Sequence, residues 1–188
     1  MSFENAKQNL KEFGKELNLE GLSFDENHTC ILGIDNTFSL HLTYEPNSDR
    51  LYLYSPVLDG LPRDDKTLLK LYQSLLEGSM LGGQMAGGGV GVAVKEELIL
   101  MHCVLEMGIG ADTLSLKRFA PIFVEAVEKW RARAKNILEG RDAEEGISSD
   151  KRSSAHPGAP HRPGSTKPKD KDDQGPHSPG GSDRFVKV

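Results

Sequence analysis

The sequence has little of what membrane-spanning and disulfide-stabilised secreted proteins require. Its 188 residues include only two cysteines, and aromatic residues make up 6% of the chain. No apolar run approaches the roughly 20 residues that cross a bilayer, and the N-terminus lacks the apolar core of a secretory signal. Cys30 and Cys103 lie within apolar, strand-like runs, which favours buried reduced thiols. We therefore expect a cytoplasmic protein without membrane insertion.

Basic residues are also too few for a phosphate-binding surface. The formal net charge is -5, and within residues 1–138 there are 19 acidic side chains against 14 basic ones. A nucleic-acid-binding domain usually carries a basic face. We therefore expect no nucleic acid among the partners.

The apolar pattern stops near residue 139. Six of the ten prolines lie after residue 156, among glycine, serine and charged residues, in a region whose one aromatic residue is Phe185. Such a composition cannot bury enough apolar surface to fold alone. We predict a single domain over residues 1–138 and a disordered tail over 139–188.

Within this domain the periodicity predicts an α+β fold with the order αβββαββα. Residues 37–44 alternate strictly, for example, with Phe38, Leu40 and Leu42 on one face. Short connections favour an antiparallel meander, and Pro121 should kink the last helix or separate its first turn. The third strand should end at Pro56. The predicted helices cover 2–17, 68–81 and 112–137, and the predicted strands cover 29–34, 37–44, 51–54, 90–94 and 98–104.

A glycine-rich block at 82–89 joins the second helix to the following hairpin. Phosphate-binding loops run from strand through glycines to a helix, whose N-terminus meets the anion. Here the order is helix, glycines, strand, and no lysine follows until Lys95. Close packing of the backbone is therefore the favoured role of these glycines.

Neither a catalytic set nor a metal site emerges from the spacing. The available metal ligands are His28, Cys30, His102 and Cys103, but adjacent residues on a strand point to opposite faces, so one face offers at most three of the four. No serine, cysteine, histidine and carboxylate pattern marks a nucleophile. We predict no catalytic residue, no metal and no cofactor. The alternative is a small α/β enzyme or ligand-binding protein that uses the face of the meander sheet.

The domain also has more apolar faces than one thin layer can cover. The helix over 68–81 and the strand with Val90, Val92 and Val94 are the main examples. Such a surplus indicates a protein partner, most simply a second copy of the chain.

Two stretches carry a family resemblance. Residues 75–92 read LLEGSMLGGQMAGGGVGV, and residues 98–104 read LILMHCV. Together with the element order, they resemble the class I type III secretion chaperones of the CesT/Tir chaperone family, and the glycine block is most similar to that of the chlamydial SycE-like members. The resemblance covers about residues 1–138. Pro121 and the long tail depart from the family pattern.

The resemblance implies a bacterial cytoplasmic homodimer without enzymatic activity. Such a chaperone binds the N-terminal chaperone-binding segment of secreted effector proteins, keeps it non-globular and presents it for export. Further partners would be the ATPase or sorting components of the secretion apparatus. By this resemblance, the dimer interface comprises Leu68, Leu69, Tyr72, Leu75, Leu76, Met80, Val90 and Val92, and the effector-binding surface comprises Phe13, Leu17, Phe38, Leu40, Leu42, Leu51 and Leu53.

Overall fold

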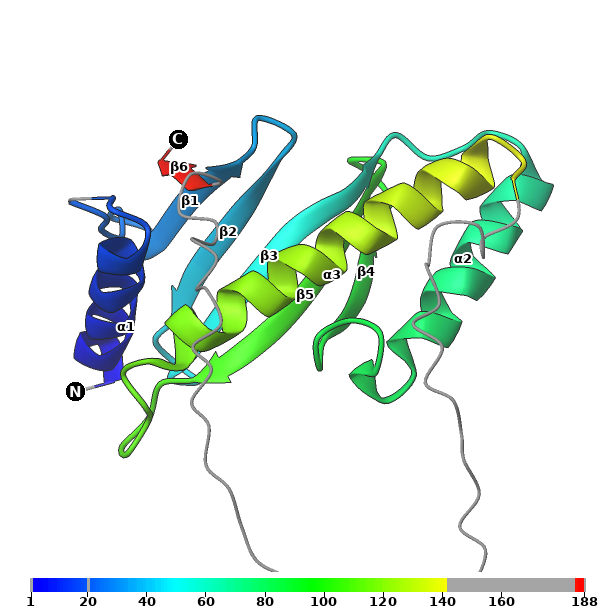
Figure 1. Cartoon of the computed structure of the whole chain (residues 1–188). Coiled ribbons are helices and arrows are strands. Elements are labelled where there is room, and N and C mark those ends of the chain that lie inside the picture. Colours follow the sequence, from blue (N-terminus) through cyan, green and yellow to red (C-terminus); the bar gives the residue numbers. More distant parts are fainter. Residues whose placement is uncertain (1, 20, 142–184, 188) are drawn as a thin grey trace, which may run out of the picture.

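The computed structural model describes residues 2–19, 21–141 and 185–187 and confirms the α+β class (Figure 1). The element order αβββαββα predicted for the domain is present in it. One further strand, β6, follows near the C-terminus. The elements are α1 (Ser2–Glu16), β1 (Thr29–Ile34), β2 (Phe38–Glu45), β3 (Arg50–Asp59), α2 (Asp65–Ser79), the 3-10 turn η1 (Met80–Gly82), β4 (Gly89–Ala93), β5 (Leu98–Glu106), α3 (Ser115–Leu138) and β6 (Phe185–Lys187).

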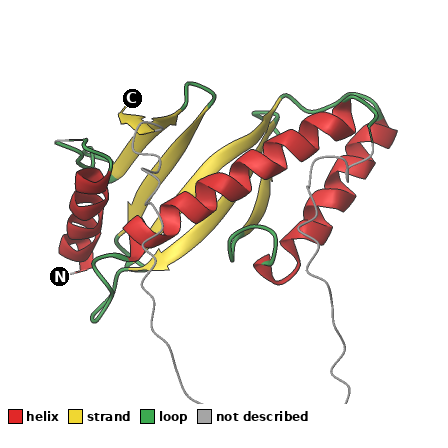
Figure 2. Ribbon diagram, in the orientation of Figure 1, coloured by secondary structure: helices red, strands yellow, loops and turns green. Residues whose placement is uncertain are grey.

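All strands form one antiparallel sheet with the order β4-β5-β3-β2-β1-β6. Tight turns pair β1 with β2 and β2 with β3, as the short connections predicted. The longest helix, α3, crosses one face of the sheet diagonally, with α1 beside its first half and α2 beside its second half (Figures 1 and 2). This arrangement places α1 near β1 and α2 near β4.

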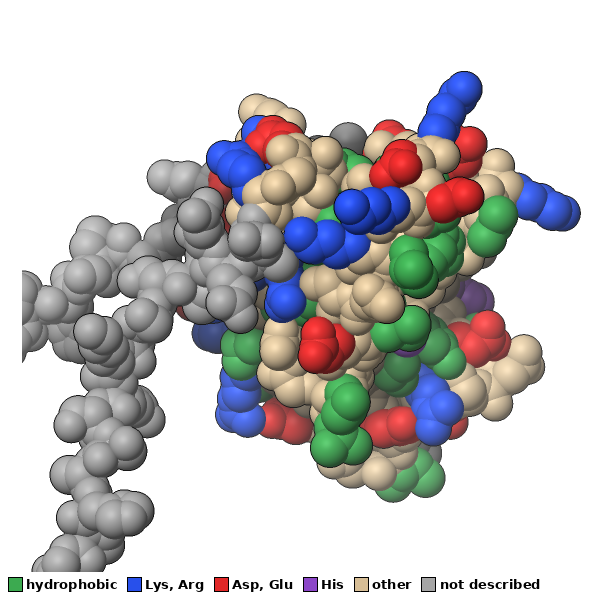
Figure 3. All heavy atoms as spheres, turned by 90° about the vertical axis from the view of Figure 1, so that its right-hand side faces the viewer, with side chains coloured by type: hydrophobic (Ala, Val, Ile, Leu, Met, Phe, Trp, Pro, Cys, Tyr) green, Lys and Arg blue, Asp and Glu red, His purple; other side chains and the backbone are tan. Residues whose placement is uncertain are grey.

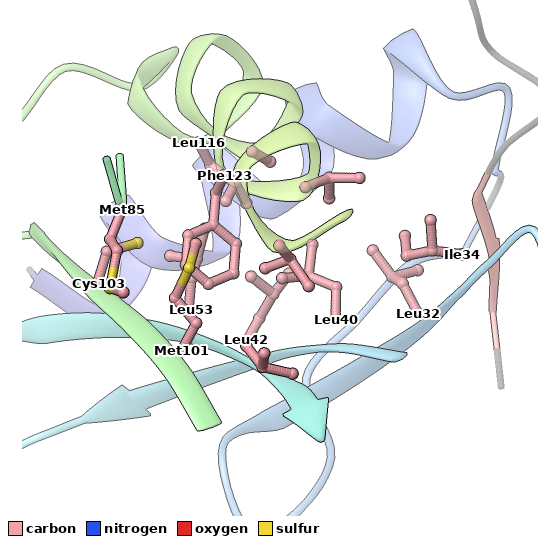
Figure 4. Close-up of a cluster of buried hydrophobic side chains, with 14 of the residues drawn as sticks. Leu32, Ile34, Leu40, Leu42, Leu53, Met85, Met101, Cys103, Leu116 and Phe123 are labelled. Carbon is pink, nitrogen blue, oxygen red and sulfur yellow. The ribbon is translucent and has the colours of Figure 1, made fainter. Parts of the chain in front are cut away.

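The core lies between this face of the sheet and α3. Leu32, Leu40, Leu42 and Leu53 extend from their strands into the layer below the helices in Figure 4, and these leucines and Phe123 of α3 are fully buried. The alternation seen in the sequence therefore sets which side chains enter the core. In the part of the chain described by the structure, no helix is both long and apolar enough to cross a membrane.

The third strand is longer than the sequence predicted, because Pro56 does not end it. β3 continues to Asp59 and pairs with β5 on both sides of a register shift between Pro56 and Leu58. A bulge accommodates a proline, which has no N–H for the ladder. The Pro56 carbonyl accepts a hydrogen bond of 2.8 Å from Arg131 of α3.

The alternative that Pro121 separates the first turn of the last helix is wrong, since α3 runs as one helix through this residue. The kink at Pro121 stays a prediction. Pro121 is solvent-exposed, so its ring lies away from the core. The packing of neighbouring Ala120 and Phe123, both fully buried, offsets the backbone hydrogen bond that proline removes.

Glycines hold α2 and the hairpin close to their neighbours. A Cβ atom on Gly78 would lie 2.0 Å from a ring carbon of Trp130, and one on Gly88 would lie 1.9 Å from the backbone oxygen of His102. Gly82 has φ +67 and faces the backbone of Gly87. These distances confirm the close-packing role predicted for the block.

The predicted tail, 139–188, lies mostly outside the described residues. Within it, Phe185–Lys187 form β6, which pairs with β1. The composition of the tail does not indicate this strand.

Asn9 is a buried polar residue that joins α1 to the start of α3. Its side-chain NH2 donates to the carbonyls of Asn5 and Asp112, both at 3.1 Å. Its side-chain oxygen accepts from the Leu116 N–H at 3.0 Å, and the side chain is inaccessible to solvent. One amide thus satisfies a donor in the first turn of α3 that the helix itself leaves free.

We expect Asn9→Ala to lower the free energy of unfolding by about 1–3 kcal/mol, because buried groups at the α3 N-terminus lose their partner. Thermal and urea unfolding measure this loss. Gln8→Ala, at the exposed neighbouring position, is the control and should change stability by less than about 0.5 kcal/mol. Equal losses in the two variants would contradict the assigned role.

Candidate functional site

A large exposed apolar surface lies where α2, η1 and β4 meet, and we call it the α2–β4 face. Leu76 is 68% exposed, Met80 70% and Leu81 99%. Figure 3 shows hydrophobic side chains gathered on this side of the molecule. Isolated exposed apolar residues are ordinary, but a contiguous group indicates contact with another protein. The face consists of Leu69, Leu76, Met80, Leu81, Val92 and Val94.

The predicted dimer residues fall partly on this face. Leu69, Leu76, Met80 and Val92 are exposed, whereas Leu68, Tyr72 and Val90 are half-buried. Leu75 is 1% exposed and lies in the core, because α2 is apolar on two sides and Leu75 faces inward. It is therefore unavailable for contact with another chain.

Leu81 and Val94 belong to the α2–β4 face but were not among the predicted interface residues. Leu81 has φ 54, a left-handed conformation that is strained for a leucine. Its side chain is held almost wholly in solvent. The sequence does not indicate this exposed, left-handed leucine, because the apolar periodicity of α2 continues to Leu81 and predicts a regular helical turn there.

The residues predicted to bind an effector segment are mostly buried. Six of the seven are at most 6% exposed, because the inward side of the meander packs beneath the helices. The exception is Phe38, which is half-buried with the Arg131 guanidinium 5.2 Å from its ring centroid. The six core residues are Phe13, Leu17, Leu40, Leu42, Leu51 and Leu53.

An apolar hollow of about 910 Å³ lies elsewhere, between α1 and the segment 18–28, and we call it the α1 groove. Phe3 lies at its wall, with ring centroids of Phe24 and His28 at 5.8 and 4.6 Å. Leu10, Leu19 and Leu22 line it further. Segment 18–28 leads directly into β1, so the groove lies next to the start of that strand.

Charged residues of α1 also line the groove. Lys7, Lys11 and Lys15 follow at intervals of four residues along one side of the helix. Glu4 and Glu12 lie 2.7 Å from Lys7 and Lys15, and these hydrogen bonds lower the pKa of both carboxyl groups. Asp25 and Glu26 contribute acidic groups from the loop side. The site therefore has an apolar lining with charges of both signs.

The start of α1 is fastened to the turn between β2 and β3. The Tyr44 hydroxyl shares its one hydrogen between Asp49 at 2.8 Å and the Ser2 hydroxyl at 3.0 Å, and Ser2 donates to Asp49. The hydrogen bonds from Ser2 and Tyr44 lower the Asp49 pKa. Phe3 stacks on Tyr44 with centroids 4.9 Å apart, so one end of the groove wall is held in place.

The opposite face of the sheet carries polar and ring-bearing side chains, among them His41 and Tyr54. His41 stacks on Tyr54 with centroids 4.8 Å apart, and burial lowers its pKa. His41 also lies 2.8 Å from the Ser39 hydroxyl. Burial raises the pKa of the Cys103 thiol to about 12, so this thiol is protonated at neutral pH and is a poor nucleophile.

The four residues considered as metal ligands do not converge. Cys103 is buried while the adjacent His102 is exposed on the other face. His28 lies in the loop before β1 and packs on Phe3. Among the residues that the structure describes, no group of three or more histidine, cysteine, aspartate or glutamate side chains is arranged to hold a metal.

An α+β protomer with an exposed apolar face and an apolar groove defines a protein that binds other polypeptide chains. The chain belongs to the Tir chaperone protein (CesT) family, whose model matches residues 8–131. The prediction of a class I type III secretion chaperone is thereby confirmed.

Solved structures of similar fold support the assignment. The HopA1-SchA chaperone-effector complex contains a chain 26% identical to this one, with a TM-score of 0.54 over 68% of this chain and 94% of that chain. The ExsC-ExsE complex contains a chain 16% identical, with a TM-score of 0.55 over 68% of this chain and 91% of that chain, and shows the same fold. A search of curated proteins found no match.

Proposed function

We propose that this chaperone is a cytoplasmic homodimer that binds the N-terminal chaperone-binding segment of effector proteins and presents it, non-globular, to the ATPase or sorting components of the secretion apparatus. Residues 1–138 are the chaperone domain in this proposal. Family membership supports a binding role, and in this proposal the protein is not an enzyme.

The single observation that carries the binding proposal is the α1 groove beside β1. An extended polypeptide can place apolar side chains in a groove while its backbone adds to a neighbouring strand edge. The groove has the apolar lining for such side chains, and segment 18–28 connects it to the sheet. Its lysines and acidic residues can pair with charges on either side of a bound segment.

The α2–β4 face supports the homodimer. Its exposed leucines, methionine and valines lie at the opposite end of the sheet from the α1 groove (Figure 1). A two-fold axis at this face would pair the same apolar residues from both copies and leave both grooves open. Two effector-binding regions would then be carried by one dimer.

We expect the double variant Leu22→Ala/Phe24→Ala to bind effector segments about tenfold or more weakly, since both apolar side chains line the groove. The measurement is pull-down of effectors co-expressed with the chaperone, followed by titration of the N-terminal segment recovered. Ile122→Ala, which removes an exposed apolar side chain of α3, is the control. Unchanged binding by a folded double variant would place the effector site elsewhere.

A further inference from the structure

The outer edge of β1 is occupied by the chain's own β6. The antiparallel register pairs Leu32 with Lys187, Gly33 with Val186 and Ile34 with Phe185. Without β6, β1 would be the last strand on this side of the sheet. An edge strand presents unpaired N–H and C=O groups that accept any extended segment of suitable register.

β6 can pair with β1 only if the chain between α3 and β6 is long enough to pass from one end of the sheet to the other. α3 ends beside α2, whereas β6 lies at the other end of the sheet, next to β1 (Figure 1). Residues 139–184 separate the two, and these 46 residues can span up to about 150 Å when extended. The tail is therefore long enough to connect α3 to β6 across the whole sheet.

We infer that β6 is an intramolecular competitor for the effector segment at the β1 edge. This inference rests on the proposed function. β6 covers three of the six residues of β1, so a longer segment that pairs along the whole strand makes more hydrogen bonds and displaces it. A tethered strand competes at a high effective concentration, which keeps the edge covered until an effector arrives.

The test compares the full chain with Val186→Pro and with Ser165→Pro. Proline removes a backbone donor and disrupts strand pairing, so Val186→Pro should release β6, while Ser165→Pro adds proline outside β6. Hydrogen exchange of the amides in residues 29–34 should be faster in Val186→Pro alone. A labelled synthetic peptide of residues 181–188 should bind Val186→Pro about tenfold tighter than the other two proteins. A tenfold difference is expected if β6 covers the β1 edge in about nine-tenths of the molecules of those two proteins.

The effector segment recovered in the pull-down is then titrated into the same three proteins, and it should also bind Val186→Pro about tenfold tighter. Equal exchange and equal peptide affinity in all three would overturn the inference. If β6 is released but the effector segment binds all three equally, competition is overturned while the chaperone function stands. If none of the three binds an effector, the proposed function fails, and competition fails with it. Binding of the effector segment to the full chain therefore separates these two failures, while the exchange and peptide measurements report only whether β6 covers β1.

Discussion

Leu76→Asp is expected to convert the proposed dimer into a folded monomer. Leu76 is 68% exposed in the protomer, so an aspartate there is hydrated in the monomer but buried without a partner in the dimer. Such a charge costs about 3–5 kcal/mol, which weakens association by roughly a hundredfold to several thousandfold. Light scattering over a concentration series measures the change.

Ile122→Asp is the matched control for this prediction. Ile122 is also an exposed apolar residue on a helix, at 55%, but it lies on α3, outside the α2–β4 face. It should leave the dimer intact. A full dimer of Leu76→Asp at micromolar concentration would move the interface to another surface, whereas loss of helical circular dichroism would mean that the substitution acts on folding.

Gly88→Ala should have the largest effect on stability. The added Cβ would lie 1.9 Å from the His102 backbone oxygen and 2.9 Å from Cys103 Cβ. Backbone cannot rotate away as a side chain can, so the segment entering β4 must separate from β5. We expect a loss of about 3 kcal/mol and a weaker dimer, because β4 carries Val92 of the α2–β4 face.

Gly91→Ala is the control, since nothing lies within 4 Å of a Cβ at that position of β4. It should be neutral or slightly stabilising, because alanine restricts the unfolded chain. Thermal unfolding of the two variants gives the comparison. Equal melting temperatures would show that the contact between Gly88 and His102 is not needed for pairing of β4 with β5.

The two surfaces assigned here differ in what they require of a partner. The α2–β4 face offers apolar side chains on rigid elements and suits a copy of itself. The α1 groove and the β1 edge offer apolar side chains and backbone groups together, and these suit an extended segment of many possible sequences. The proposed function uses both properties, because the proposed dimer pairs one fixed surface with itself while the groove accepts extended segments of different sequence.

Much of the fold was predictable because its elements are periodic. The alternation of residues 37–44 predicted β2 within one residue at each end, and the spacing of apolar residues predicted α1 and α2. The antiparallel meander followed from short connections alone. The glycine block was correctly interpreted from the order of helix, glycines and strand, which is the reverse of a phosphate loop.

The candidate site was less predictable because one apolar pattern serves both core and surface. Leu75 and Leu76 are adjacent in the sequence, yet one is 1% and the other 68% exposed. The effector residues were placed on the inward side of the meander, where the helices bury them. The sequence pattern does not indicate the α1 groove, because its apolar lining is divided between a helix and an irregular loop that has no hydrophobic periodicity.

Within residues 1–138, the sequence by itself determined the class of each helix and strand, their order and the family, since these depend on local periodicity and on short motifs. Only the tertiary structure decided which apolar side chains face α3 and which face solvent, that Asn9 joins α1 to α3, and that Phe185–Lys187 pair with β1. The physical reason is that burial and edge pairing depend on contacts with segments that are distant in the chain. A local sequence pattern holds no information about those contacts.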